Sequence, residues 1–81
     1  MSTVTVQLFA SYADMLGAPT VELPLTPGTT VQDLVRRIRS LPGASSLPLA
    51  PRVAINRSFA GSDQLIEASD EVALIPPVAG G

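Results

Sequence analysis

Residues 71–77 read EVALIPP, a nearly continuous apolar run that two prolines end at once. A run without polar alternation is typical of a central strand that is buried on both faces. The segment 3–9 alternates instead between apolar and polar residues, which is the pattern of a half-buried strand. Because an apolar strand belongs in the middle of a sheet, we expect the last strand to lie beside the first.

The second strand is expected at an edge of the sheet. Apolar residues alternate again over 21–25, but Pro24 has no backbone N–H group and interrupts the donor pattern of the strand. Between these two strands, residues 10–16 carry apolar side chains at helical spacing and stop at Gly17. This pattern predicts a short helix or helical turn with a glycine at its C-terminal end.

The clearest helix begins at Thr30. Thr30 and Asp33 form a capping box, in which each side chain accepts a hydrogen bond from the backbone N–H of the other residue. The apolar residues that follow share one helix face and therefore predict packing on a sheet; they are Val31, Leu34, Val35, Ile38 and Leu41. Three arginines lie off this stripe, where they form a solvated face or the rim of a docking surface; they are Arg36, Arg37 and Arg39.

The remaining segments are short. Residues 41–51 (LPGASSLPLAP) read as a surface loop, for which one helical turn is a further interpretation, and 52–55 read as a strand. A tight turn at 56–57 leads to a brief return strand at 58–60. The segment 63–68 is ambiguous, and a single helical turn is one interpretation. This order of elements predicts an α+β fold, a β-grasp with a mixed four- to five-stranded sheet packed on one main helix.

The composition excludes most catalytic and metal chemistry. The chain has no cysteine and no histidine, which removes thiolate nucleophiles, imidazole acid–base catalysis and the usual zinc and iron–sulfur ligands. Among the seven acidic residues, only Asp70 and Glu71 are adjacent, and neighbours on a strand point to opposite faces. We therefore expect a solvated turn there and no metal site.

The charge and length limit the partners and the compartment. The chain has 81 residues, which is enough for one domain; we expect residues 1–75 to form it and 76–81 to be an extended tail. A formal net charge of −2 has the wrong sign for a surface that binds nucleic-acid phosphates. No run reaches the ~20 apolar residues of a membrane span, and the N-terminus lacks a basic leader. We expect a cytoplasmic protein with no nucleic-acid or membrane partner.

The C-terminal tail offers the one reactive group that stands out. Its residues are Pro76, Pro77, Val78, Ala79, Gly80 and Gly81. The prolines favour an extended polyproline II segment, and the side chains then shrink to two glycines, a shape that fits a narrow channel. The terminal carboxylate is an anion at neutral pH and reacts only if another enzyme activates it, for example as an acyl-adenylate. A frayed end is the simpler alternative.

These features resemble the MoaD/ThiS family of ubiquitin-like sulfur carriers, and in particular its MoaD branch, the small subunits of molybdopterin synthase. The matching residues are Leu8-Phe9-Ala10, the Val-Ala-Ile-Asn block at 53–56 and the segment 70–81, DEVALIPPVAGG. The resemblance covers nearly the whole chain in length and element order. Its most specific part is the spacing of an acidic turn, an apolar strand, two prolines and a terminal Gly-Gly.

The resemblance implies a sulfur carrier subunit that is not an enzyme by itself. The carboxylate of Gly81, which follows Gly80, would be adenylated by an ATP-dependent activating enzyme and converted to a thiocarboxylate, with no cofactor bound by the chain. The tail would then enter the large subunit of molybdopterin synthase and donate sulfur to a pyranopterin precursor of the molybdenum cofactor.

Partner contacts are also implied by the resemblance. In the tail they fall on Pro76, Pro77, Val78 and Ala79. On the sheet face they fall on Phe59, beside a turn, and Ile75, beside the tail. Phe9 could join them, but core packing is the expectation for that side chain.

The chain departs from the family pattern at two places. The family often has Arg-Glu where this chain has Ala13-Asp14, so an ion pair made there is missing. It usually has Gly-Asp where this chain has Ser69-Asp70, and Ser69 would cost on the order of 1 kcal/mol if it needed a positive φ.

Three alternatives to the molybdopterin role stay open. A carrier for thiazole or another sulfur pathway would usually lack the double proline at 76–77. A ubiquitin-like protein modifier would use the same activated Gly81 carboxylate to form a bond with lysines of target proteins. A plain binding module would carry an inert tail.

Overall fold

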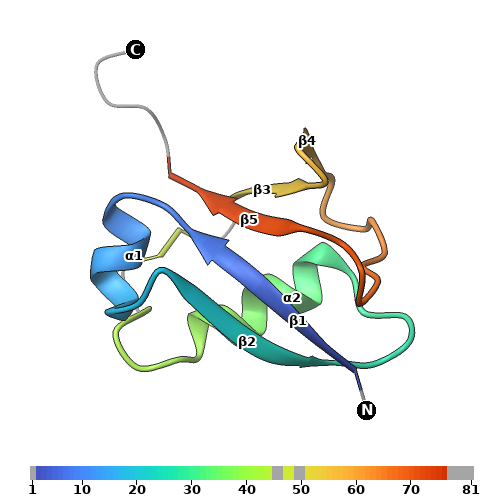
Figure 1. Cartoon of the computed structure of the whole chain (residues 1–81), viewed down its shortest axis with the longest axis horizontal. Helices are drawn as coiled ribbons and strands as arrows, with labels where there is room; N and C mark the ends of the chain where they lie inside the picture. Colours follow the sequence, from blue (N-terminus) through green and yellow to red (C-terminus); the bar gives the residue numbers. More distant parts are fainter. Residues whose placement is uncertain (1, 45–46, 49–50, 77–81) are drawn as a thin grey trace.

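The computed structural model describes residues 2–44, 47–48 and 51–76. Over these residues, five strands form one mixed sheet in the order β2-β1-β5-β3-β4 (Figure 1). The elements are β1 (Ser2–Leu8), α1 (Ser11–Leu16), β2 (Thr20–Leu25), α2 (Val31–Arg39), β3 (Arg52–Ile55), β4 (Ser58–Phe59) and β5 (Val72–Ile75). Strands β1 and β5 are parallel and the other neighbours are antiparallel, which confirms the α+β prediction and the place of the last strand beside the first.

Helix α2 forms where its capping box predicts. The Thr30 hydroxyl accepts a hydrogen bond from the Asp33 backbone N–H at 3.2 Å, and the Asp33 carboxylate accepts one from the Thr30 N–H at 3.2 Å. The apolar stripe faces the sheet and is buried from Val31 to Ile38. Leu41 lies beyond the end of the helix and packs half-buried against the core.

The core lies between α2 and one face of the sheet. Alternate residues of β1 and β5 point into it, and the most deeply buried of these are Val4, Val6, Val72 and Leu74. Full burial of one such side chain contributes about 1.5–3 kcal/mol relative to leaving it in water. Neither α1 nor α2, the helices of the described residues, is long and apolar enough to cross a membrane.

Strand β2 lies at an edge of the sheet, as Pro24 predicts. The three arginines of α2 differ in exposure and do not all form a solvated face. Arg36 is exposed, whereas Arg37 and Arg39 are half-buried. Arg37 donates a hydrogen bond from Nη1 to the Pro24 carbonyl at 2.6 Å, so it links α2 to the edge strand.

Two loop predictions need correction. The described part of the loop at 41–51 is not confined to the surface, because Ala44 and Leu47 are buried in the core. Gly43 in this loop has φ +86°, and a Cβ there would lie 2.7 Å from the Met15 carbonyl oxygen, so the loop passes close to α1.

The segment 63–68 contains no helical turn. Leu65 instead forms an isolated β-bridge with Thr30, and the backbone N–H of Val31 donates to the Gln64 carbonyl at 3.0 Å. The N–H of Gln32 donates to the Ser62 carbonyl at 2.9 Å. The segment is therefore kept extended, because the carbonyl groups of Gln64 and of Ser62 just before the segment accept from N–H groups at the start of α2 that have no partner within the helix.

Strand β5 is not buried on both faces, although its sequence predicts this. Val72 and Leu74 point into the core, whereas Ala73 and Ile75 lie half-buried on the opposite face. No helix of the described residues covers that face (Figure 1). The apolar residues of β5 therefore lie on both faces of the sheet, one face packed in the core and the other open to solvent.

Candidate functional site

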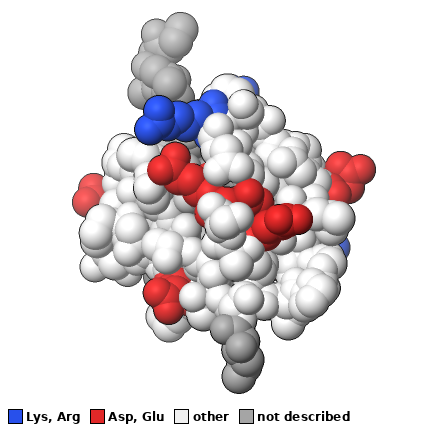
Figure 2. All heavy atoms as spheres, turned by 45° about the vertical axis from the view of Figure 1, so that its right-hand side comes forward, with Lys and Arg blue, Asp and Glu red and all other residues white. Residues whose placement is uncertain are grey.

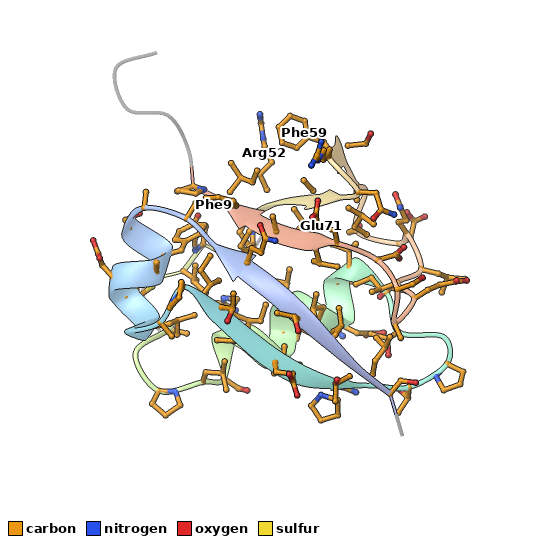
Figure 3. The ribbon with its side chains drawn as sticks, viewed as in Figure 1. Phe9, Arg52, Phe59 and Glu71 are labelled. Atoms are coloured by element: carbon orange, nitrogen blue, oxygen red, sulfur yellow. The ribbon has the colours of Figure 1, made fainter. Side chains whose placement is uncertain are left out.

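The uncovered face of the sheet carries an apolar hollow of about 390 Å³. We call it the sheet hollow, and its lining residues are Gln7, Phe9, Ala54, Arg57, Phe59, Glu71, Ala73 and Ile75. Figure 3 shows four residues on this side of the sheet, with Arg52 and Phe59 close together at the β4 end, Phe9 near the end of β1 and Glu71 near the start of β5.

The floor of the sheet hollow is low because two alanines meet there. Ala73 of β5 pairs with Gln7 of β1 on one side and with Ala54 of β3 on the other. Ala54 pairs in turn with Phe59 of β4. Since each alanine contributes only a methyl group, the larger side chains around them stand above the floor as walls.

Phe9 forms one wall, and its predicted place in the core is wrong. Its side chain is 46% exposed. The alternation of β1 explains this position, because Val4, Val6 and Leu8 face the core and the odd-numbered residues face the other side. The same alternation was visible in the sequence and would have placed Phe9 outside.

Phe59 forms the opposite wall and is 65% exposed. A tight turn presents it, since Asn56 and Arg57 both have positive φ, at 53° and 70°, as a two-residue hairpin turn requires. Ile75, the other predicted contact residue of the sheet face, lines the same hollow from β5. The structure therefore brings together Phe59 and Ile75, which the resemblance implied, and adds Phe9.

The adjacent carboxylates at Asp70 and Glu71 have structural partners. Asp70 accepts hydrogen bonds from the Glu67 N–H at 2.8 Å and the Asn56 side-chain amide at 3.0 Å. The Asn56 amide oxygen accepts from the Glu71 N–H at 2.9 Å, so this network fixes the hairpin against the start of β5. These contacts agree with a turn rather than with a catalytic pair.

The departure at Ser69 carries no backbone strain. The residues other than glycine with positive φ in the described chain are Ala10, Asn56 and Arg57. The cost that would have followed from a positive φ at Ser69 therefore does not arise.

The charged groups of the sheet hollow lie at its rim. Arg57 and Glu71 form an exposed ion pair with Nε and Oε1 3.7 Å apart, which contributes little to stability. Arg52 places its guanidinium over the Phe59 ring, 4.9 Å from the ring centroid. Figure 2 shows acidic side chains gathered in a band on the adjoining side, with arginine side chains at its upper end. Across the described residues, no three acidic side chains gather closely enough to hold a metal ion.

The sheet hollow adjoins the start of the tail. Strand β5 ends at Ile75, which lines the hollow, and the half-buried Pro76 follows directly. The other tail residues for which a role was predicted lie outside the described residues; they are Pro77, Val78, Ala79, Gly80 and Gly81. A protein that docks in the hollow would contact the residue from which the tail continues.

Comparisons with known proteins point to one family. The sequence profile of the ThiS family matches residues 6–81. A relative named molybdopterin synthase sulfur carrier subunit, from Dictyostelium discoideum, is 34% identical over 79 residues, which cover 91% of each chain.

Solved structures agree on the fold. SAMP1 from Haloferax volcanii, a small archaeal modifier protein, is 30% identical with a TM-score of 0.82, over 98% of this chain and 99% of that one. A complex of subunits 1 and 2 of the molybdopterin-converting factor from Helicobacter pylori contains a chain that is 18% identical, with a TM-score of 0.70 over 98% of this chain and 99% of that one. At 18% identity, the similarity to the Helicobacter pylori chain shows the ubiquitin-like β-grasp fold alone.

Proposed function

The chain belongs to the ThiS family, and on that premise we propose that it is the sulfur carrier subunit of a molybdopterin synthase. The observation that carries the proposal is the extent of the family match, which runs through the double proline to Gly81. The name of the Dictyostelium relative supports the molybdopterin branch of the family. In this role the chain carries the sulfur and a larger subunit provides the catalysis.

The reactive group is the carboxylate of Gly81. In an activating enzyme, a carboxylate oxygen attacks the α-phosphorus of ATP, and pyrophosphate leaves. Hydrosulfide then attacks the acyl carbon, AMP leaves with loss of a proton from sulfur, and a thiocarboxylate remains. The chain cannot carry out this activation itself, because it has neither cysteine nor histidine and its other side chains offer no comparable nucleophile or base.

Sulfur delivery takes place in the larger subunit. The thiocarboxylate sulfur attacks a carbon of the pyranopterin precursor and displaces an oxygen substituent, which leaves with a proton. Water then hydrolyses the resulting thioester. The sulfur stays on the precursor and Gly81 regains its carboxylate, ready for another cycle. The absence of a Cβ at Gly80 and Gly81 lets an enzyme close around the backbone at the reacting carbon.

The sheet hollow is the docking surface for these partners. Its walls at Phe9 and Phe59 expose apolar rings that the fold does not need for its own core. Residues 76–81 span at most ~20 Å if fully extended, so a partner that holds the hollow has the carboxylate within reach of its own active site. Since activation consumes ATP, we place this cycle in the cytoplasm.

Intact mass spectrometry tests the proposal. When the chain is expressed with its activating enzyme, we expect its mass to rise by the replacement of one oxygen with one sulfur. One glycine appended after Gly81 moves the carboxylate away from the reacting position, and a glycine inserted before Ser2 is the matched control. The proposal is wrong if the chain extended after Gly81 accepts sulfur as well as the control does.

A second function is favoured by the likeness to SAMP1. That protein is named a modifier and shares 30% identity over almost the whole chain. A modifier of this type would join the activated Gly81 carboxylate to a lysine amine, with loss of AMP. Peptide mass spectrometry of the host proteome would then detect lysines linked to an Ala-Gly-Gly remnant, and a sulfur carrier alone would leave none.

A further inference from the structure

Arg52 is a cation without an acidic partner in the described chain. The ion pair at this side of the sheet joins Arg57 to Glu71. Among residues 2–44, 47–48 and 51–76, no carboxylate lies within 4.0 Å of the Arg52 guanidinium. Its described neighbour is the Phe59 ring, 4.9 Å away from ring centroid to guanidinium carbon.

The position of the guanidinium over the Phe59 ring leaves it available for a further contact. A guanidinium is planar, and its N–H donors point outward in that plane. When one face lies over a ring, the N–H groups at the edge remain available to an acceptor. A carboxylate is the acceptor that matches this fork with two parallel hydrogen bonds. Both side chains are exposed, so a partner protein can reach them.

The position of Arg52 links this contact to the sheet hollow. Arg52 pairs with Ile75 across β3 and β5, and Ile75 lines the hollow beside the start of the tail. The next row on the same face of the sheet is the pair Ala54 and Ala73, which forms the apolar floor. When a side chain of a partner protein fills the sheet hollow, the residues beside it on the partner's surface therefore lie against Arg52.

The other charges at the rim do not compete for this role. Arg57 and Glu71 pair with each other, so among the described residues at the rim of the sheet hollow Arg52 is the charge without a counter-charge, on a chain whose formal net charge is −2. The complementary surface has an apolar side chain for the hollow and a carboxylate beside it for the guanidinium.

We propose that Arg52 determines partner specificity by binding a carboxylate of the large catalytic subunit, next to an apolar side chain of that subunit that fills the sheet hollow. This inference rests on the proposed function, because it takes the large subunit as the occupant. The apolar contact supplies most of the affinity, and the charge pair excludes surfaces that are equally apolar but basic.

Isothermal titration calorimetry with the large subunit from the same organism tests this role. We expect Arg52→Ala to weaken binding about tenfold and Arg52→Glu about a hundredfold or more, since a like charge is then placed against the carboxylate. The matched control is Arg36→Glu, the same charge change at an exposed position on α2, which lies on the other face of the sheet. It should bind as the wild type does.

Salt dependence separates a charge contact from a merely structural role of Arg52. If Arg52 only held the Phe59 ring in place, Arg52→Ala would weaken binding by the same factor at every ionic strength. We expect instead that the wild-type affinity falls more steeply with added salt than the affinity of Arg52→Ala. Parallel salt curves for the two chains would overturn the proposal.

Charge exchange identifies the partner group. Substitution of interface Asp and Glu residues of the large subunit by Arg, one at a time, should restore binding to Arg52→Glu at one position.

If none restores it, or if Arg52→Glu binds the wild-type subunit as tightly as the unaltered chain, the inference is wrong and the proposed function stands. If the wild-type chain does not bind the large subunit at all, the proposed function fails as well. Loss of self-association without loss of subunit binding would assign Arg52 to a second copy of this chain and overturn the proposal.

Discussion

Ala10 has an unusual backbone conformation for a residue other than glycine. It has φ 50° and ψ −123°, a conformation that an L-residue with a Cβ rarely adopts. It lies between Phe9, a wall of the sheet hollow, and Ser11, the first residue of α1. The methyl group of Ala10 cannot form a hydrogen bond, so the start of α1 has no side-chain cap. The sharp turn allows β1 to end with Phe9 on the open face while the chain enters α1.

The strain at Ala10 predicts that Ala10→Gly stabilises the fold. Removal of the Cβ relieves about 1–3 kcal/mol of strain, and the greater freedom of glycine in the unfolded chain offsets about 0.5–1 kcal/mol of that. We expect the free energy of unfolding in urea to rise by about 1 kcal/mol. Ala13→Gly, in the regular part of α1, is the control and should lower it by about 1 kcal/mol. Equal losses in the two variants would contradict the strain argument.

Helix α2 is the element whose start is most completely satisfied. Its first two N–H groups donate to carbonyl oxygens of the segment 63–68 and of Ser62 just before it, and its third donates to the Thr30 hydroxyl. The backbone N–H and hydroxyl of Thr30 hold the pKa of the Asp33 carboxyl below its ordinary value of 3.8, and the charges of Arg36 and Arg37 add to this effect.

The capping box predicts an acid-dependent loss of stability. A carboxyl whose pKa is lower in the folded state stabilises the fold above its unfolded pKa, and that stability is lost as the pH falls through the folded value. We expect the difference in unfolding free energy between the wild type and Asp33→Asn to be largest at neutral pH and to shrink below pH 3.8. Urea unfolding from pH 7 to pH 3 measures it, and two parallel curves would contradict the assignment. In the same measurement at neutral pH, Thr30→Ala should lower the free energy of unfolding by about 1 kcal/mol, because the N-cap hydrogen bond is lost.

Elements with a local pattern could be predicted from the sequence. The capping box at 30–33 and the alternation of β1 involve residues within a few positions of one another, so both appear in the sequence as they do in the structure. The segment 63–68 could not be predicted this way, because its conformation depends on N–H groups of α2 that are about thirty residues away in the chain. The apolar run of β5 shows the same limit, since its composition does not tell whether a second layer covers it.

Only part of the candidate site could be predicted, because the rest depends on contacts between segments that are distant in the chain. Phe59 and Ile75 came from the family resemblance, and the structure places both at one hollow. The stacking of Arg52 on Phe59 depends on the register of β3 against β4, which no local pattern contains. The expectation of core packing for Phe9 is wrong, although the alternation of β1, continued by one residue past Leu8, places Phe9 on the open face.

At the scale of the whole molecule, the two faces of the sheet have different tasks. One face packs against α2 and forms the core, and the other exposes two phenylalanine rings around the sheet hollow. An exposed apolar patch is a liability for a free protein and is typical of a surface that a partner covers. Leu8 and Phe9 illustrate the division, since they are adjacent in the chain but 5% and 46% exposed.

Substitutions at these two neighbours should separate folding from partner binding. Leu8→Ala leaves a cavity under the sheet and should lower the free energy of unfolding by about 2–5 kcal/mol, most of what a domain of this size possesses. Phe9→Ser removes a ring that is nearly half outside the fold, so we expect a loss of about 1 kcal/mol or less. Calorimetry with the large subunit should nevertheless show an affinity at least about tenfold lower for Phe9→Ser, because the apolar wall contributes binding energy only in the complex. If Phe9→Ser unfolds as readily as Leu8→Ala, Phe9 contributes to the core and not only to the open face. If Phe9→Ser binds the large subunit as tightly as the wild type, Phe9 contributes nothing to that contact, and the docking surface has lost one of the two walls on which it depends.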